Sequence, residues 1–379
     1  MTNYINKCFR LFHLKMSRIK WFLKRASCYK WFNIKEKYRR LLIIVKSLFY
    51  NDFLSWSYVC DILLEPIFWF VENFTSSLGP VFVTIVSLLK VFIVFIAYWI
   101  GLPYWWEKSP TSTIFLLIFG NWLLINVTFH YYMGVKVTAG YPPQGGLIPE
   151  AVSICKKCIK PKPPRTHHCS VCNKCVLKMD HHCPWLNNCV GHYNHRHFFQ
   201  YMAFTVIGVL FIMIFGLEIA YEEFFPDDPE LDGHPVRINN SVIIPVMESM
   251  DHLTKEERDK IVQHAVDRAF GEFRRKLIIF AALICVATLA ALGALTWWHA
   301  GLISQGETSI EAHINRSEQE KNKSLGRKYR NPYDLGSREN WRQFLGLNGR
   351  TWWYILLPST HGPYGNGLTW KTAHNIKIS

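Results

Sequence analysis

Charged residues are scarce in this sequence of 379 residues, at 19% against roughly 25% in a typical soluble domain. With 50% hydrophobic residues the chain is too apolar for a disordered protein, and with 15% aromatic residues it is too aromatic for a coiled coil. The charges lie between apolar blocks of about 20 residues, a layout typical of a polytopic membrane protein. The N-terminus lacks the long apolar core and cleavage site of a signal peptide, so we expect it to be retained.

Four apolar stretches are long enough to cross a hydrocarbon core ~30 Å thick at ~1.5 Å per residue. They are residues 81–102, 113–133, 198–220 and 277–303. A fifth apolar region, residues 53–74, carries Asp61, Glu65 and Glu72, so we expect it to form an interfacial or re-entrant helix. Lys90 interrupts the first stretch, and we expect its side chain to snorkel or to face the helix bundle.

The distribution of charge predicts the orientation. Lys and Arg outnumber acids in segments 1–50, 134–197 and 304–379, whereas segment 221–274 holds 13 acids against six basic residues. The positive-inside rule therefore places both termini and segment 134–197 in the cytosol and segment 221–274 in the lumen. Residues 248–273 of the luminal segment are expected to form an amphipathic helix. Topology and anionic lipid explain the net charge of +15 better than nucleic acid does, and we expect no nucleic-acid partner.

Seven of the 11 cysteines lie between Cys155 and Cys189, in the segment expected to be cytosolic. Disulfide scaffolds are typical of short secreted chains, so metal binding or catalysis is the better interpretation. The spacing of Cys155 and Cys158 puts two thiolates on one tight turn, as zinc sites require. The segment is too short and polar to bury a core, so bound metal is expected to supply its folding energy.

The number of ligands points to one cysteine with another task. Two closed tetrahedral zinc sites need eight ligands, which six cysteines and two histidines would provide, so one of the seven cysteines is left over. Cys183 directly follows Asp180, His181 and His182. A thiol beside an imidazole that an acid orients has the arrangement of an activated nucleophile. The alternative, with Cys183 as a ligand and Cys189 as the spare thiol, also fits the spacing.

The segment CKKCIKPKPPRTHHCSVCNKCVLKMDHHCPWLNNCV resembles the DHHC cysteine-rich domain of the protein S-acyltransferases, or palmitoyltransferases. The resemblance covers the whole chain, with four spans and this segment between the second and third. It implies two structural zinc ions with interleaved ligands. One ion would be held by Cys155, Cys158, His168 and Cys175, and the other by Cys169, Cys172, His182 and Cys189. Both sites are closed, so the metal would shape the loop without activating water.

The same resemblance assigns roles around the spare thiol. It implies that Cys183 is the acyl-accepting nucleophile, His181 the base and Asp180 the acid that orients His181. The family has a Thr-Thr-x-Glu motif after the fourth span, and this chain has Thr308, Ser309, Ile310 and Glu311 there. Ser309 keeps the hydroxyl that is expected to form hydrogen bonds near Asp180.

Two further features come from the family. Asn331-Pro332-Tyr333 and Asn340-Trp341 resemble its C-terminal Asn-aromatic motif, which supports the spans. Gly208, on the third span, matches a position that helps to set the depth of the acyl cavity. A glycine there is expected to leave room for chains of palmitate length or longer. The alternative is that Gly208 only permits close helix packing.

The fold class expected is a polytopic α-helical membrane protein with four transmembrane helices and a cytosolic two-zinc domain. Its expected parts are residues 1–78 (cytosolic, with the interfacial helix), 79–133 (helices one and two), 134–197 (the cysteine-rich domain), 198–303 (helices three and four, with the luminal loop 221–274) and 304–379 (a cytosolic C-terminal region). The segment GYPPQG and the residues around the end of the fourth span are most similar to an endoplasmic-reticulum subgroup of the vertebrate family members. The expected location is therefore the endoplasmic-reticulum membrane, with the Golgi as the alternative.

The function implied is protein S-palmitoylation by a ping-pong route. A long-chain acyl group would pass from acyl-CoA to Cys183 and then to membrane-proximal cysteines of cytosol-facing proteins. Two other classes fit a zinc-rich membrane protein. A membrane-anchored zinc-binding ubiquitin ligase would need eight ligands and no spare thiol, and a non-catalytic zinc module that recruits a partner would tolerate Cys183→Ser.

Overall fold

The computed structural model describes residues 41–42, 56–143, 148–225, 237–238, 241–242 and 254–373. The chain forms two compact units, one of Met1–Leu78 with Ser170–Asn173 and the other of Gly79–Cys169 with Lys174–Ser379. Among its described residues the first unit holds part of helix α3 and the turn Ser170–Asn173. The second unit holds the spans and most of the cysteine-rich segment.

Four helical stretches are long and apolar enough to cross a membrane. They are Ser77–Lys108, Pro110–Lys136, His195–Phe224 and Ala265–Ser304. Each contains one of the four stretches expected from the sequence, so the predicted fold class is confirmed. The first comprises the end of α3 (Trp56–Ile96), the π-helical turn η1 (Ala97–Gly101) and α4 (Leu102–Lys108).

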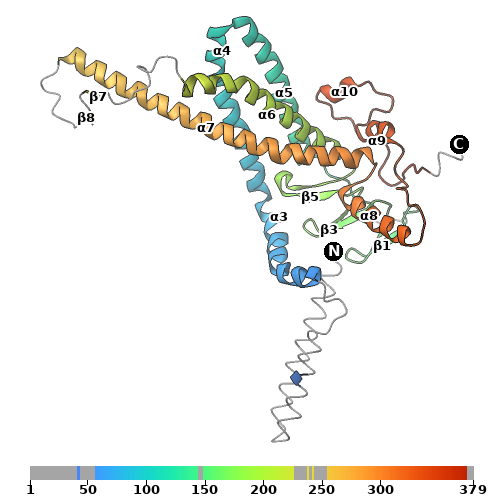
Figure 1. Ribbon diagram of the computed structural model, residues 1–379. Coiled ribbons are helices and arrows are strands. Elements are labelled where there is room, and N and C mark those ends of the chain that lie inside the picture. The colour runs from blue at the N-terminus through green and yellow to red at the C-terminus, as the bar shows by residue number, and fades with distance from the viewer. Residues whose placement is uncertain are drawn as a thin grey trace, which may run out of the picture. The chain divides into compact units, whose positions relative to one another are not determined.

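The other three spans are single helices. The second is α5 (Pro110–Lys136), the third is α6 (His195–Phe224) and the fourth is the end of α7 (Lys255–Ser304). Helix α6 packs against both α5 and α7 (Figure 1). One buried cluster joins Leu123 and Val127 of α5 to Phe204 of α6. In a bilayer such contacts stabilise through close packing, because lipid tails are as apolar as the side chains.

Two helices are longer than the sequence predicted. Residues 56–74 do not form a separate helix, because α3 continues without a break from Trp56 to Ile96; residues 53–55 lie outside the described part. Residues 255–273 likewise continue into the fourth span as the 50-residue helix α7, while residues 248–253 are not described. A short hairpin, β7 (Arg237–Ile238) with β8 (Ser241–Val242), lies in the segment before α7. The predicted interfacial position of residues 53–74 stays a prediction.

Lys90 faces the helix bundle. Its Nζ atom lies 3.5 Å from the centre of the Tyr131 ring and 5.9 Å from that of Tyr201. These cation–π contacts give the ammonium group an attractive partner within the bundle. Of the two placements expected for Lys90, the structure shows the bundle-facing one.

The cysteine-rich segment between α5 and α6 is built of three short antiparallel hairpins. They are β1 (Ser153–Cys155) with β2 (Lys160–Lys162), β3 (His167–Cys169) with β4 (Lys174–Val176), and β5 (His181–Cys183) with β6 (Asn188–Val190). A 3-10 turn, η2 (Pro184–Leu186), closes the third hairpin. Each turn needs one residue with a left-handed backbone, which Ile159, Asn173 and Asn187 provide at φ values of 52°, 52° and 49°.

The chain after α7 forms α8 (Ser309–Ser324), α9 (Ser337–Phe344) and α10 (Trp353–Leu356). Helices α8 and α9 pack against α7, and Ile355 of α10 packs against the buried cluster at the end of α7. Asn340 is 7% exposed and donates from Nδ2 to the Ser304 carbonyl at 2.9 Å, while its Oδ1 accepts from the Leu335 amide at 3.1 Å. Trp341 donates to Ser304 Oγ at 2.9 Å. These contacts give the predicted Asn-aromatic motif its structural role at the end of the fourth span.

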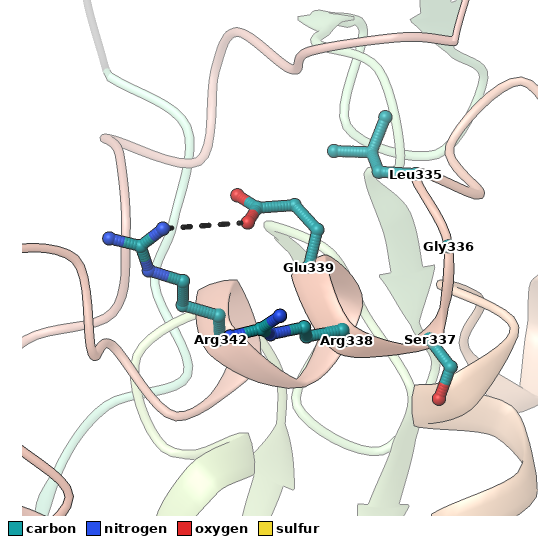
Figure 2. A pocket seen from close by; sticks show the side chains of 6 residues that line it. All are labelled: Leu335, Gly336, Ser337, Arg338, Glu339 and Arg342. Carbon is teal, nitrogen blue, oxygen red and sulfur yellow. Dashed lines mark ion pairs between the residues drawn. The ribbon is translucent and has the colours of Figure 1, made fainter.

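A surface hollow of about 430 Å³ lies at the start of α9 (Figure 2). It is lined by Leu335, Gly336, Ser337, Arg338, Glu339 and Arg342. The dashed line in Figure 2 is the ion pair between Arg342 Nη1 and Glu339 Oε2, at 3.9 Å with both side chains well exposed. None of these residues belongs to the predicted site.

The contrast between Asn340 and Arg342 yields a prediction for stability. Asn340→Ala should lower the free energy of unfolding by about 1–3 kcal/mol, because it leaves a buried amide and a carbonyl without partners. Arg342→Ala removes only an exposed ion pair, which contributes about 0–1 kcal/mol. Thermal unfolding of the two purified variants beside the parent checks this. Equal shifts in the two variants would contradict the structural role of Asn340.

Candidate active site and metal centres

The pairing of the hairpin strands sorts the cysteines and histidines into two sets. His168 lies directly opposite Cys175 in the second hairpin, and His182 lies directly opposite Cys189 in the third. Side chains of directly opposed residues point to the same face of a hairpin. The second and third hairpins thus each present one imidazole and one thiol together, and the hairpin before each of them presents a CxxC pair.

The first set consists of Cys155, Cys158, His168 and Cys175, with one ligand atom from each residue within 4.8 Å of the others. The Nδ1 atom of His168 lies 3.1, 3.7 and 4.0 Å from the sulfurs of Cys158, Cys155 and Cys175, and the sulfurs of Cys158 and Cys175 are 3.8 Å apart. A tetrahedral zinc ion with bonds of about 2.3 Å to sulfur separates its ligand atoms by about 3.6–3.8 Å. The donor set and its spacing therefore fit zinc.

The second set consists of Cys169, Cys172, His182 and Cys189, again with all ligand atoms within 4.8 Å. The Nδ1 atom of His182 lies 3.8 Å from Cys169 Sγ and 3.6 Å from Cys189 Sγ. Three thiolates and one imidazole form a closed site of the structural kind. The structure thus brings together all eight residues in the groups expected, and both groups are able to bind zinc.

A repeat of 14 residues underlies the three hairpins, and our sequence analysis missed it. Cys155, Cys169 and Cys183 are 14 residues apart and each ends the first strand of a hairpin. In the first two hairpins a second cysteine follows three residues later, whereas the third has Leu186 at that position. Cys183 therefore belongs to neither metal set, because the third hairpin lacks the second thiol of the CxxC pair.

Strand β5 directs two adjacent histidines to opposite faces. Successive side chains of a strand point to opposite faces, so His181 and Cys183 share one face while His182 points to the other. His182 faces the second metal set, and His181 faces Asp180, with Nδ1 at 2.6 Å from Asp180 Oδ2. Because Nδ1 is held by the carboxylate, Nε2 is the nitrogen that can exchange a proton with a thiol.

The charges of this pair stabilise each other. Burial disfavours the charged form of His181, but the hydrogen bonds with Asp180 and Cys183 outweigh it and raise the pKa of His181 to about 9. Burial also disfavours the Asp180 carboxylate, but nearby His195 and the hydrogen bond from His181 hold the pKa of Asp180 well below its usual range. Asp180 is thus an anion that can orient the imidazole.

The N-terminus of helix α8 holds the other side of Asp180. The Ser309 amide donates to Asp180 Oδ1 at 2.8 Å, and the Ser309 hydroxyl donates to Oδ2 at 2.8 Å. Unpaired amides and the positive end of the helix dipole make a helix N-terminus suited to an anion. A serine in place of the family's second threonine thus keeps the hydroxyl contact.

Thr308 and Glu311 fix the end of that helix. They form a capping box, in which Thr308 Oγ1 accepts from the Glu311 amide at 3.3 Å and Glu311 Oε2 accepts from the Thr308 amide at 2.9 Å. Glu311 also accepts from Arg165 Nε at 2.6 Å, so the helix is tied to the turn before β3. Burial disfavours the Glu311 carboxylate, but the Arg165 guanidinium outweighs it and lowers the pKa of Glu311.

Cys183 lies at the membrane end of the hairpins. It is 6% exposed and belongs to a buried cluster with Tyr131 of α5 and Phe198 and Met202 of α6. Farther along α6, a Cβ atom added to Gly208 would meet no atom within 4 Å. The surroundings of Gly208 therefore offer no support for close helix packing as the reason for a glycine there.

The sequence analysis assigned no role at the site to three residues that lie near it. Arg165 anchors Glu311, and the buried His195 and His299 lie beside Asp180 and His181. His195 begins α6, beyond the third hairpin, so the 14-residue repeat does not extend to it. For His299, which comes from α7, the sequence carries no signal either.

The two metal sets lead to a prediction about loss of metal. His182→Ala should lower the bound zinc and destabilise the hairpins together, because binding energy and folding energy are the same quantity in such a segment. His167→Ala is the matched control, since His167 belongs to neither set. Elemental analysis of both purified variants measures the metal. Unchanged zinc in His182→Ala would contradict the interleaved arrangement.

The comparisons with known proteins agree with this geometry. Residues 149–316 match the family described as DHHC palmitoyltransferase. The chain is 40% identical over 358 residues to the palmitoyltransferase ZDHHC16 of Homo sapiens, and this alignment covers 90% of each chain. It is 38% identical over 375 residues to the palmitoyltransferase ZDHHC16B of Danio rerio, and this alignment covers 97% of this chain and 95% of the relative.

More distant similarity is of the same kind. A probable protein S-acyltransferase 16 of Arabidopsis thaliana is 29% identical over 219 residues, covering 58% of this chain and 62% of that one. The vertebrate subgroup expected from the sequence is the sixteenth member of the family, and its similarity to this chain is confirmed. The chain belongs to the DHHC palmitoyltransferase family, and it is a multi-pass membrane enzyme that acts as a protein S-acyltransferase.

Proposed function

We propose that Cys183 is the residue that carries the acyl group, with His181 as its base and Asp180 as the acid that orients His181. The observation that carries the proposal is the 2.6 Å contact between His181 Nδ1 and Asp180 Oδ2, on the strand face that also presents Cys183. An oriented imidazole beside a thiol is the arrangement that activates a cysteine nucleophile. Long-chain acyl-CoA is the proposed co-substrate.

The first half-reaction transfers the acyl group to the enzyme. His181 takes the proton of the Cys183 thiol, and the thiolate attacks the thioester carbonyl of acyl-CoA. The sulfur–carbon bond to CoA then breaks, and the CoA thiolate leaves with the proton that His181 returns. Asp180 stays ionised throughout and stabilises the imidazolium form of His181.

The second half-reaction passes the acyl group on. His181 takes the proton of a substrate cysteine, whose thiolate attacks the acyl carbonyl on Cys183. The Cys183 thiolate leaves and recovers a proton from His181. Because Cys183 lies among side chains of the spans, substrate cysteines close to the membrane are favoured. The proposed substrates are therefore cytosol-facing proteins with membrane-proximal cysteines.

Zinc is the metal we propose for the two ligand sets. Each set is filled by four protein ligands, so zinc there would hold the hairpins together and leave no position for substrate. A recruiting module or a ubiquitin ligase would have no use for the Asp180–His181 pair beside a thiol outside both sets. Family membership and this pair favour the acyltransferase over both alternatives.

The nucleophile can be tested with labelled palmitoyl-CoA. Cys183→Ser should abolish self-acylation that hydroxylamine releases, and it should keep the metal content of the parent, because Cys183 belongs to neither metal set. Cys285→Ser is the matched control, since it changes another buried cysteine, on α7. Self-acylation of Cys183→Ser at the parent rate would refute the assignment.

The chain-length preference tests the acyl cavity. We propose that the acyl chain extends from Cys183 along α6 past Gly208, where a Cβ atom would meet open space. Gly208→Phe should shift the preference toward shorter acyl-CoAs, because each CH₂ group kept out of an apolar site forfeits ~0.8 kcal/mol. Gly216→Phe, eight residues farther along the same helix and equally open, is the control. An equal loss at all chain lengths in Gly208→Phe would count against the cavity.

The proposed location is the endoplasmic-reticulum membrane, with both termini in the cytosol. In the proposed arrangement the chain has five parts, which end at residues 78, 133, 197, 303 and 379. The first, third and fifth parts lie on the cytosolic side of the membrane. The acyl-CoA pool that Cys183 would use is cytosolic, which requires the hairpins on that side.

Glycosylation can test this orientation. Asn239 begins a sequon in the segment expected to be luminal and lies outside the described residues, whereas Asn315 begins a sequon on α8. Asn315 is 8% exposed and donates to Glu307 Oε2 at 2.6 Å. Endoglycosidase treatment of the expressed protein should remove a glycan from the parent and from Asn315→Gln, but find none on Asn239→Gln. A glycan on Asn315 would reverse the proposed orientation.

A further inference from the structure

More imidazoles surround Asp180 than acyl transfer uses. Besides His181, His195 of α6 lies with Nε2 at 4.0 Å from Asp180 Oδ1. His299 of α7 lies near both histidines, with its ring centre 5.9 Å from that of His181 and 5.8 Å from that of His195. The side chains come from three elements, and His299 lies 104 residues beyond His195 in the sequence, so the grouping is a product of the fold.

The two additional histidines are buried and have nitrogens without hydrogen-bond partners. His299 is 1% exposed and its Nδ1 has no partner; His195 is 3% exposed and neither of its nitrogens has one. Buried polar atoms almost always have a partner in the protein or a bound water or ion. Unpartnered imidazole nitrogens gathered around a carboxylate are what a cation site requires.

We propose that Asp180, His181 and His299 form a third metal site, which binds Zn²⁺ reversibly and inhibits the enzyme. One ligand atom from each residue lies within 4.8 Å of the other two. Two imidazoles with one carboxylate are a known donor set for zinc, with a fourth position open to water. Calcium and magnesium prefer oxygen ligands, so this set discriminates against them.

Inhibition follows from the chemistry of the imidazole and rests on the proposed role of His181 as the base. A neutral imidazole has one nitrogen with a lone pair and one with a proton. Whichever nitrogen binds the cation, the other carries the proton, so His181 can no longer accept the proton of the Cys183 thiol. The metal therefore stops the reaction before the acyl group is transferred.

The ligand set also makes this site distinct from the two others. It has three protein ligands and no thiolate, whereas each hairpin set has three thiolates and an imidazole. It is therefore expected to exchange its ion, while the closed sets retain theirs. The side chain of His181 is 33% exposed although that of Asp180 is fully buried, so an ion can approach from the side of His181.

Metal counting tests the site without any acyl transfer. Full-length Cys183→Ser protein in lipid nanodiscs is dialysed against increasing free Zn²⁺ and analysed for bound metal, so that the nucleophile takes no part. The bound zinc should rise from two to three ions per chain. When His299→Gln is added to Cys183→Ser, the bound zinc should stay at two ions per chain over the same range of free Zn²⁺. When His313→Gln is added instead, which removes an exposed histidine of α8, the bound zinc should still reach three ions per chain.

The outcomes separate the proposal from its alternatives. A count that stays at two in Cys183→Ser, or reaches three with His299→Gln as well, overturns the third site. Retention of the two tightly held ions shows that a variant has folded, and His299→Asn serves if His299→Gln does not. Because the number of bound zinc ions is measured in Cys183→Ser, the result tests the third metal site even if Cys183 proves not to carry the acyl group.

Activity supplies a second readout, taken as the ratio of self-acylation with and without Zn²⁺ within each variant. With Cys183 intact, Zn²⁺ should inhibit the parent and His313→Gln at the same concentration. His299→Gln should need about tenfold more Zn²⁺ or higher for the same ratio, the loss typical when the residues around a bound metal are changed. Equal sensitivity in all three would mean that zinc inhibits elsewhere, for instance at the Cys183 thiol, and would overturn the proposal.

Discussion

The buried carboxylate of Asp180 is the group on which the arrangement of the site depends. A carboxylate that is 1% exposed is stable only when hydrogen bonds and opposite charges replace its water. Those partners are the imidazole of His181 and the amide and hydroxyl of Ser309 at the start of α8. The need to satisfy one charge thus fixes the third hairpin, the helix after the fourth span and the imidazole of His181 to one another.

The hairpin repeat explains how one segment serves two purposes. In the first two 14-residue units the first strand ends at the first cysteine of a CxxC pair. In the third unit Leu186 stands at the position of the second cysteine. Strand alternation then turns His182 toward the metal ligands and His181 toward Asp180. If zinc holds the hairpins as proposed, its binding energy positions Cys183, the proposed nucleophile, and the metal itself does not contact the substrate.

Much of this could be predicted from the sequence, because the signals are local. The four spans are long apolar runs, and the CxxC pairs are typical of zinc sites. Asp180, His181 and Cys183 are near neighbours in the chain. The helix predicted over residues 248–273 is present over the described residues 255–273, but it is not a separate element, since α7 continues from there into the fourth span. Apolar content ends at the membrane boundary, but a helix continues as long as its backbone hydrogen bonds do.

The sequence by itself determined the fold class, the family and the two cysteine–histidine groups able to bind zinc, because these depend on hydrophobicity and on spacing over a few residues. Only the tertiary structure decided what surrounds Asp180. Ser309 and His299 lie 129 and 119 residues from it along the chain, and they meet it because α7 and α8 pack against the hairpins and α6. Contacts over such distances depend on the packing of whole helices, which no local pattern encodes.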